Sequence, residues 1–449
     1  MRILIKEGFI ISPADNLEAK KDILIEEGKF LSIEEKIEDN KADKVILAKG
    51  KIVLPGLIDL HVHLREPGRE DKETIFTGTL SSAKGGFTKI LAMPNTEPPI
   101  DSSQNVRWLR EIIKKDAWVD VLISSCITLK REGRELVNLE ELKKEGVVAI
   151  TDDGSSVNDH QLLLQALKEA KRLGLLVILH CEDKQLSDKG LVNLGIISTR
   201  LGLRGIPTEA EYKRIERDIK LAQEADTSVH ITHVSCKESI EIIAKAKKNG
   251  VRVTCDTAPH YFALSEDELL DFDANKKINP PLRTKEDVLA IKEAIKGGII
   301  DCIASDHAPH TEHEKEIEFE NACFGTIGLE TSLAVAIKEL IEPKIISWQK
   351  LVELFYVKPA KILNLDKETF KANKTATLIV LNPNKEWTVK KEDFLSRSKN
   401  SAFLGKTLKG RVEYTIYKGK IIYAECSDSS VPKDQHPDTS GIPKVCFEK

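Results

Sequence analysis

Eight short apolar runs, separated by longer amphipathic stretches, constrain the fold of this chain more than any other feature. The runs span residues 57–63, 88–94, 119–124, 147–151, 175–180, 228–233, 251–256 and 301–305. Stretches with helical spacing of apolar residues lie between them, among them 159–172, 209–225, 236–249 and 284–296. Eight strands with intervening helices predict a (β/α)8 barrel of the α/β class. A doubly wound open sheet is the alternative, which the lack of a glycine-rich dinucleotide motif after any strand disfavours.

Both ends of the chain have a different pattern. Short β-like runs occur at 2–11, 22–33, 44–54, 376–381 and 411–424. The tetrapeptides EEGK and YKGK stand between some of them and are typical of turns. We therefore expect a small β domain built from residues 1–54 and 366–424, which flanks a barrel spanning 55–365.

Composition and charge limit the classes of function. Hydrophobic residues make up 41% of the 449 residues, which is enough for a large barrel and a smaller module. The net charge of −4 offers no basic surface for nucleic acid. Lys6 and Glu7 interrupt the apolar N-terminus, so it does not resemble a signal peptide, and no apolar run is long enough to span a bilayer. We expect a cytoplasmic protein without membrane contact.

The cysteines and the C-terminal segment suggest no further chemistry. The six cysteines up to Cys323 stand singly, without a CxxC pair, and are predicted to be bystander thiols. Residues 425–449 are rich in Ser, Asp and Pro, a composition typical of a mobile tail. Docking of this tail, with pairing of Cys426 and Cys446, is the alternative that the sequence leaves open.

Metal-capable side chains gather at the predicted strand ends. His61 and His63 close the first strand, and their spacing of two places both on the same face. Later strands end in Asp152 and Asp153, His180, His233 and Asp306. In a barrel these positions share the rim where active sites are built. Eleven histidines placed at random would rarely fill one rim so heavily, so we predict a metal centre, and imidazole with carboxylate suits Zn²⁺ best.

Some neighbouring residues are weaker candidates. His230 lies three residues before His233 and therefore points to the opposite face of a regular strand, which predicts a packed residue. Asp152 and Asp153 also face opposite ways, and periodicity does not choose between them. His160 and His313 have no supporting context and are expected to be exposed.

Seven motifs together resemble a known family. They are GLIDLHVHLREPG (56–68), MPNT (93–96), TDDG (151–154), HCED (180–183), HITHVS (230–235), INPPLR (278–283) and SDHAPH (305–310). In this order they are similar to a dihydroorotase of the longer bacterial type, within the amidohydrolase superfamily. The resemblance runs from about residue 1 to 424, and HVHLR with SDHAPH is its most specific part.

The resemblance implies roles for the rim residues. His61 and His63 would hold one metal together with Asp306, and His180 and His233 would hold a second. Many relatives bridge the two metals with a carboxylated lysine. No lysine stands at the end of the fourth strand here, and Asp153 is the residue that matches the bridging carboxylate of this type. One or two zinc ions per chain are therefore expected.

Substrate contacts are implied in the same way. Arg65 and Asn95 would bind the substrate carboxylate, Asn279 and His310 would complete the pocket, and Phe324 and Gly325 would offer backbone contacts to the ring. The planar fork of arginine suits a carboxylate better than lysine does. Cys323 departs from the family pattern, in which proline is common at this position.

The implied reaction is the reversible interconversion of (S)-dihydroorotate and N-carbamoyl-L-aspartate in pyrimidine biosynthesis. Metal-activated water would attack, and Asp306 would act as general acid and base. Another cyclic amidohydrolase, such as a dihydropyrimidinase, hydantoinase or allantoinase, is the first alternative, and an inactive scaffold paralogue is the second. We also expect a homo-oligomer and a mobile lid at 308–323, and we leave open an association with aspartate transcarbamoylase.

Overall fold

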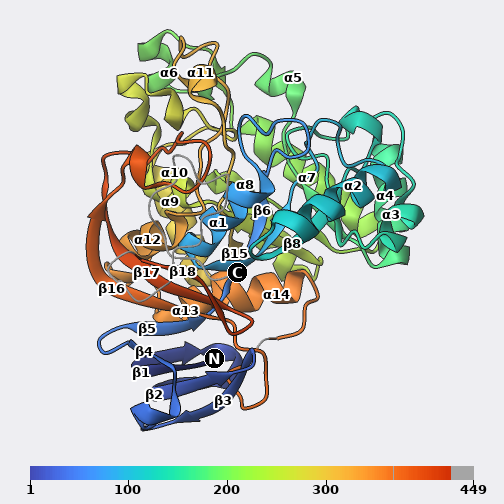
Figure 1. The fold of residues 1–449 in the computed structure, drawn as a ribbon. Coiled ribbons are helices and arrows are strands. Elements are labelled where there is room, and N and C mark those ends of the chain that lie inside the picture. The colour runs from blue at the N-terminus through green and yellow to red at the C-terminus, as the bar shows by residue number, and fades with distance from the viewer. Residues whose placement is uncertain (368, 426–449) are drawn as a thin grey trace.

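A closed barrel of eight parallel strands forms the centre of the computed structural model, which describes residues 1–367 and 369–425 (Figure 1). Around the barrel the strands are β6 (Leu57–Val62), β7 (Phe87–Ala92), β8 (Asp120–Ser125), β9 (Ala149–Ile150), β10 (Leu176–Leu179), β13 (Val229–Ile231), β14 (Val253–Thr257) and β15 (Cys302–Ile303). A parallel bridge between Val62 and His307 closes the circle. The barrel prediction is confirmed, and the open-sheet alternative is excluded.

Several strands end one or two residues before their predicted limits, and β13 and β15 are two of them. The runs 228–233 and 301–305 were expected to be extended throughout, but β13 stops at Ile231 and β15 at Ile303. The reason is local backbone conformation. His233 has φ +43° and Asp306 has φ +49°, and this left-handed region cannot continue a strand.

Helices surround the barrel. The principal ones are α1 (Ile75–Gly85), α2 (Ser103–Asp116), α3 (Leu139–Lys144), α4 (His160–Leu173), α7 (Glu209–Glu224), α8 (Lys237–Lys248) and α10 (Lys285–Gly297). Helix α4 illustrates why they form. The Asp159 side chain accepts a hydrogen bond from the Leu162 N–H at its start, buried apolar side chains recur at helical spacing, and Gly174 (φ +63°) ends it. The four helical stretches predicted from periodicity are found within two residues of their expected ends.

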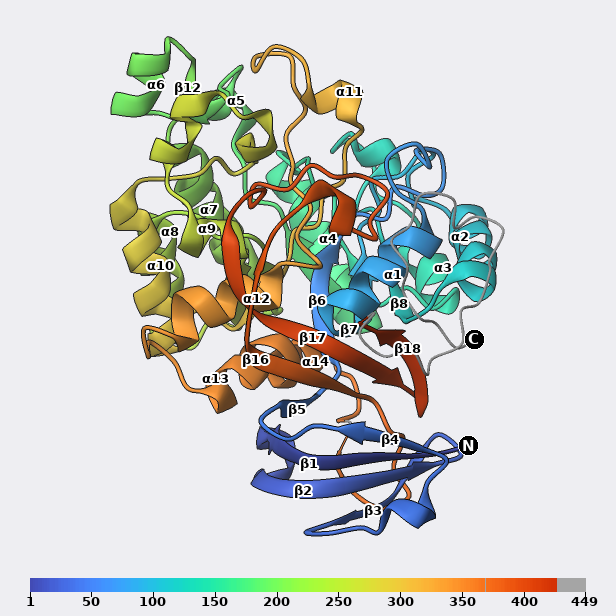
Figure 2. The ribbon, with the colours of Figure 1, turned by 60° about the vertical axis from the view of Figure 1, so that its left-hand side comes forward.

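Shorter elements extend both rims of the barrel. They are β11 (Val192–Asn193), β12 (Gly205–Ile206), α5 (Lys184–Ser187), α6 (Ile196–Leu201), α9 (Pro259–Ala263), η4 (Glu266–Asp271), η5 (Ala274–Lys276), α11 (Glu312–Lys315), α12 (Ser332–Ala336), η6 (Ile337–Ile341), α13 (Trp348–Val352), η7 (Glu353–Val357) and α14 (Lys358–Ile362). In both views, α5, α6 and α11 lie at the end of the barrel that is far from the N-terminal strands of residues 2–47 (Figures 1 and 2). They follow the carboxyl ends of β10 and β15, so this end carries the rim on which the site was predicted.

The two chain ends share one sheet, as the turn signals indicated. Its strands follow the order β18 (Lys420–Ala424), β17 (Thr407–Tyr417), β16 (Leu378–Thr388), β5 (Ile52–Pro55), β1 (Arg2–Ser12), β2 (Leu17–Glu26) and β3 (Lys29–Glu34), and β4 (Lys44–Leu47) pairs with β1. The short helices η1 (Pro13–Asp15) and η2 (Asp39–Lys41) connect strands within it. Alternate apolar side chains, among them Ile3, Ile23, Leu378 and Ile416, form its own core.

The segment between β16 and β17 returns to the barrel. It includes η8 (Lys391–Asp393), and Asn400 donates to the carbonyls of Ala308 (3.1 Å) and Gly325 (3.2 Å). Although periodicity assigned residues 366–424 to the β domain, this part of the chain therefore forms a wall beside the barrel mouth.

Two further predictions concern the chain as a whole. The six cysteines up to Cys323 are free thiols, as expected, whereas Cys426, Cys446 and nearly all of the predicted tail lie outside the described residues. Among the described residues, none of the helices combines the length and the apolar character that crossing a membrane requires.

Candidate active site

Six side chains from separate stretches of sequence meet at the carboxyl end of the barrel. His61 belongs to β6, and the other five, His63, Asp153, His180, His233 and Asp306, lie just beyond strand ends. All six are buried, with exposed fractions between 1% and 7%. The two histidines spaced by two residues converge, since the Nε2 atoms of His61 and His63 both lie 3.6 Å from Asp306 Oδ1.

Asp153 lies between the two groups of histidines. Its Oδ2 is 3.5 Å from His63 Nε2, whereas its Oδ1 lies 3.6 Å from His180 Nδ1 and 3.7 Å from His233 Nε2. The same Oδ1 is 3.3 Å from His61 Nε2. One carboxylate thus faces ring nitrogens on both sides. Its neighbour Asp152 points away and binds the N–H groups of Ile127 (2.8 Å) and Thr128 (3.1 Å), which answers the question that periodicity left open.

The donor set fits a divalent cation. His61 Nε2 and Asp153 Oδ1 are buried and have no hydrogen-bond partner in the described part of the chain. Burial opposes protonation of His61, but the nearby carboxylates of Asp153 and Asp306 outweigh it and raise its pKa to about 10. Such an excess of buried negative charge is what a bound cation would neutralise, and two triads of ligand atoms, His61–His63–Asp306 and His61–Asp153–His233, are compact enough to hold one.

Partners on the outer ring nitrogens orient the imidazoles. His63 Nδ1 lies 2.8 Å from Asn95 Oδ1, an atom that can only accept, so this nitrogen carries a proton and Nε2 presents its lone pair to the centre. His180 Nε2 lies 3.1 Å from Glu182 Oε2, and by the same reasoning its Nδ1 faces inward. Asn95, predicted to be a substrate contact, therefore also orients a histidine.

Sequence analysis missed three buried carboxylates that support the site. Glu182 orients His180, Asp256 accepts from the His233 N–H (2.6 Å), and Asp59 accepts from the His61 N–H (3.0 Å). Each of them has a detectable signal in the sequence. Glu182 and Asp59 each stand two residues from a predicted ligand, which on an extended chain puts them on the same face. Asp256 ends the predicted strand 251–256, and this position is the signal that could have identified it.

Arg65 and His310 lie together at the mouth. Arg65 Nη2 is 3.4 Å from His310 Nε2, and its Nε donates to the Pro309 carbonyl (3.1 Å). Burial lowers the pKa of Arg65 to about 10, so it remains charged at neutral pH. Burial, together with the charges of Arg65 and Lys72, lowers the pKa of His310 to about 3 and keeps it neutral. A cavity of about 260 Å³ opens beside His310.

The other predicted substrate residues lie on neighbouring loops. Asn279 donates to Glu182 Oε2 (3.0 Å), which brings it to the His180 side of the centre. Gly325 has φ +138°, and a Cβ there would approach the Ala308 Cβ to 2.9 Å, so a side chain is excluded. Its N–H donates to the Lys277 carbonyl (2.8 Å). The ring of Phe324 lies 4.8 Å from Lys277 Nζ.

The three histidines that were predicted to lie outside the metal centre do so. His230 is fully buried, with Nε2 2.8 Å from Asp256 Oδ2, and belongs to the barrel interior. His160 and His313 are exposed.

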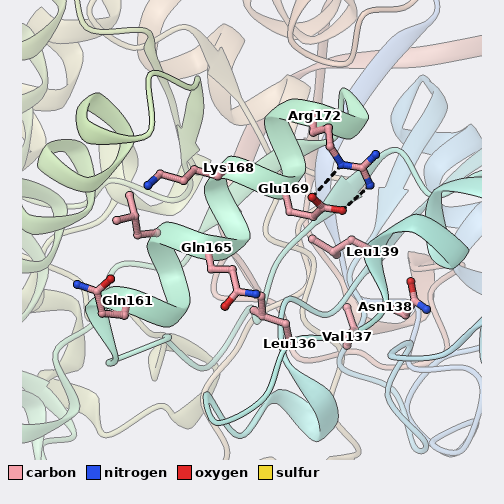
Figure 3. Close-up of a pocket in the computed structure, with 10 residues that line it drawn as sticks. Leu136, Val137, Asn138, Leu139, Gln161, Gln165, Lys168, Glu169 and Arg172 are labelled. Atoms are coloured by element: carbon pink, nitrogen blue, oxygen red, sulfur yellow. Dashed lines mark hydrogen bonds and ion pairs between the residues drawn. The ribbon is translucent and has the colours of Figure 1, made fainter.

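A wide surface cavity of about 730 Å³ lies elsewhere, between α3 and α4 (Figure 3). Leu139, Gln165 and Lys168 contribute to its walls, together with Glu169 and Arg172, which form an ion pair (2.6 Å). None of the predicted site residues lines it. We therefore assign this cavity no part in the chemistry.

The predicted lid at 308–323 contains α11 and is anchored by two buried lysines. Lys315 Nζ donates to the carbonyls of Cys323 (2.7 Å) and Gly325 (2.9 Å). Lys277 Nζ donates to those of Phe319 (2.8 Å) and Glu320 (3.0 Å). Mobility of this loop stays a prediction, and any opening would have to break these contacts.

Replacing Lys315 with methionine is expected to change how stability depends on pH. Burial lowers the pKa of Lys315 from 10.5 to about 7. Between these values the unfolded chain binds a proton that the folded chain has released, so stability rises with pH across this window, by about 1.4 kcal/mol per pH unit at most. Lys315→Met should abolish this contribution. Melting temperatures between pH 6 and 10 measure it.

Lys391→Met is the matched control for this prediction. Lys391 contacts the same loop through Glu312 and Glu316 (2.9 Å each) but lies at the surface. Its removal should leave the difference between pH 7 and pH 10 unchanged. Identical pH profiles for Lys315→Met and the wild type would contradict the prediction.

Comparison with known proteins agrees with this geometry. A family model described as dihydro-orotase-like matches residues 50–239. A dihydroorotase of Elusimicrobium minutum is 49% identical over 421 residues, which cover 94% of this chain and 97% of the relative. A dihydroorotase of Caldicellulosiruptor saccharolyticus is 47% identical, with 94% and 98% covered. The chain belongs to the dihydroorotase family. The resemblance inferred from the seven motifs is thereby confirmed, and so is membership of the metal-dependent cyclic amidohydrolases.

Solved structures extend the comparison beyond dihydroorotases. The L-hydantoinase (dihydropyrimidinase) of Arthrobacter aurescens superposes with a TM-score of 0.84 at 25% identity, covering 94% of this chain and 96% of that one. The dihydropyrimidinase of Brevibacillus agri gives 0.80 at 26% identity, with 94% and 95% covered. This chain therefore shares its barrel and flanking sheet with hydantoinases, so the fold alone does not identify the substrate.

Proposed function

We propose that this protein interconverts (S)-dihydroorotate and N-carbamoyl-L-aspartate at the mouth of its barrel. The observation that carries the proposal is the meeting of four imidazoles and two carboxylates beside the charged guanidinium of Arg65. The imidazoles and carboxylates suit a cation. The guanidinium suits the substrate carboxylate, which distinguishes dihydroorotate from other cyclic amides. High identity to dihydroorotases over nearly the whole chain supports the same activity.

The six buried side chains would hold one or two divalent cations, and zinc matches their chemistry best. His61, His63 and Asp306 would bind one ion, and His180 and His233 the other. Asp153 would serve both, because its two oxygens face different histidines. When bound, the metal supplies Lewis-acid chemistry, since it lowers the pKa of water and polarises a carbonyl.

Asp306 would move the proton. In the hydrolytic direction a water oxygen forms a bond to the ring carbonyl carbon, and the C–N bond of the ring amide breaks. Asp306 accepts the proton that the water loses and delivers it to the departing nitrogen. In the reverse direction the same carboxylate takes the proton from the carbamoyl nitrogen as the C–N bond forms, and gives it to the carboxyl hydroxyl, which leaves as water when the C–O bond breaks. Its position beside His61 and His63, 3.6 Å from each Nε2, supports this role.

Arg65, with Asn95, Asn279 and His310, would anchor the substrate. When the substrate carboxylate is held in place, the ring is oriented so that its amide faces Asp306. The reacting groups then need no further encounter, because they are already positioned within one complex. Arg65 remains charged, and the neutral His310 beside it adds a polar contact without a competing charge. Phe324 and Gly325 would border the ring through their backbone atoms.

Metal removal is expected to abolish activity, and zinc should restore it. Dihydroorotate absorbance, followed with metal-depleted protein and graded Zn²⁺, measures both.

The site should also prefer dihydroorotate over dihydrouracil and allantoin by at least about 10³-fold in kcat/KM, because a site built to pair a charged group discriminates strongly against analogues that lack it. The His61→Ala, His63→Ala double variant should not recover with zinc. Equal turnover of dihydrouracil would favour the hydantoinase alternative.

Assembly and location complete the proposal. We also propose a cytoplasmic homo-oligomer without membrane or nucleic-acid partners, and association with aspartate transcarbamoylase as the alternative assembly.

A further inference from the structure

A buried carboxylate beneath the site gathers three hydrogen bonds. Asp256, on β14, is 1% exposed. It accepts from the His233 N–H (2.6 Å), from the Thr232 hydroxyl (3.2 Å) and from His230 Nε2 (2.8 Å). None of these contacts belongs to the proton transfer or to substrate anchoring proposed above. Two of them nevertheless lead directly to predicted metal ligands.

The first route runs through the Thr232 hydroxyl. Its Oγ1 lies 2.7 Å from His61 Nδ1. A hydroxyl has one proton, and here the acceptor-only carboxylate of Asp256 receives it. Thr232 therefore presents a lone pair to His61, which must carry its proton on Nδ1. The inner nitrogen, Nε2, then faces Asp153 (3.3 Å) and Asp306 (3.6 Å), and a cation that replaced the proton held there by the two carboxylates would be bound by its lone pair.

The second route runs through the backbone. His233 has φ +43°, a conformation that costs a non-glycine residue free energy and persists only where its surroundings hold it. The short bond from its N–H to Asp256 Oδ1 does so. This conformation leaves His233 Nε2 2.8 Å from His180 Nδ1 and 3.7 Å from Asp153 Oδ1. Asp256 thus supports one histidine in each of the two predicted ligand groups.

We propose that Thr232 and Asp256 are positioning residues for the metal centre, in which the hydroxyl relays the negative charge of Asp256 to His61 and fixes its proton on the outer nitrogen. This inference rests on the proposed metal site. A carboxylate bound directly to a metal-ligating histidine raises its basicity and fixes its orientation. Here a hydroxyl is inserted between the two groups, and the same carboxylate also secures a second ligand.

Removing the hydroxyl should weaken metal binding. Thr232→Val keeps the shape of the side chain, and we expect its zinc dissociation constant, from competition with a chromogenic chelator, to rise about 10- to 100-fold. Thr232→Ser keeps the hydroxyl and should stay within about threefold of the wild type. In kinetics with saturating metal, Thr232→Val should lower kcat and leave KM unchanged, because Arg65 and His310 are not disturbed.

Two further variants separate positioning from packing. Thr254→Val removes the partner of His230 Nδ1 (2.8 Å) at the far end of the same network and should leave zinc affinity unchanged. Asp256→Asn removes the charge, and His230 can accept its amide by exchanging tautomers, so folding should persist while zinc affinity falls at least as far as in Thr232→Val.

The outcomes are distinct. Zinc binding by Thr232→Val at wild-type affinity would overturn the relay alone, and so would equal losses in Thr232→Ser or Thr254→Val. A wild-type chain that takes up no divalent cation would overturn the metal site and this inference with it.

Discussion

Replacing Asp306 with asparagine is expected to lower kcat for dihydroorotate by about 10²- to 10⁴-fold, which is the usual contribution of a positioned general acid and base. Asparagine keeps the size of the side chain but cannot accept the proton from water. Two features hold Asp306 in place: its left-handed backbone (φ +49°), and Asp59, which accepts from the N–H of the preceding Ser305 (3.1 Å). Steady-state kinetics in both directions measure the effect, and both should fall together.

The control for this prediction lies at the opposite end of the same strand. Asp301 is also buried, and it binds the Lys247 ammonium and the Cys255 N–H (2.9 Å) at the amino end of β15. Residues at that face of a barrel support stability rather than chemistry. Asp301→Asn should therefore lower the melting temperature and keep kcat within a few-fold of the wild type. A kcat of Asp306→Asn within tenfold of the wild type would remove Asp306 from the proposed proton transfer.

The barrel and its metal-ligand rim were predictable because both depend on local spacing. A strand of period two that ends in His61 and His63 sends both rings to one side whatever the rest of the chain does. Likewise, the carboxyl ends of parallel strands lie at one rim in any closed barrel. Spacing within the first strand, together with the shared rim of parallel strand ends, was therefore sufficient to predict most of the site.

Choices between adjacent residues depended on distant partners instead. Asp152 and Asp153 have equivalent local patterns, and only the amides of Ile127 and Thr128, more than 20 residues earlier, draw Asp152 out of the centre. The ends of β13 and β15 were also set by tertiary contacts, which hold His233 and Asp306 in left-handed conformations that strand periodicity does not anticipate.

The wall between β16 and β17 had no sequence signal at all. Asn400 accepts from the His310 N–H (3.1 Å) and donates to Gly325, and Ser398 donates to the Lys72 carbonyl (2.6 Å). These are single hydrogen bonds from an irregular segment, without repeat or periodicity. Such contacts become visible only when two parts of the chain about 75 to 330 residues apart are brought together.

Arg65→Ala is expected to lower kcat/KM for dihydroorotate by about 2–5 kcal/mol, or roughly 30- to several thousand-fold, because the substrate carboxylate would be buried without its partner. Turnover of dihydrouracil, which lacks that carboxylate, should hardly change, and neither should zinc content. Arg65→Lys should recover only part of the loss, since an ammonium cannot pair with both oxygens in one plane.

Arg69→Ala, which removes contacts to Asp71 and Glu314 (2.9 Å each) on the same segment, is the control and should spare the preference for dihydroorotate. Parallel losses on dihydroorotate and dihydrouracil in Arg65→Ala would mean that Arg65 supports the mouth rather than recognising the carboxylate.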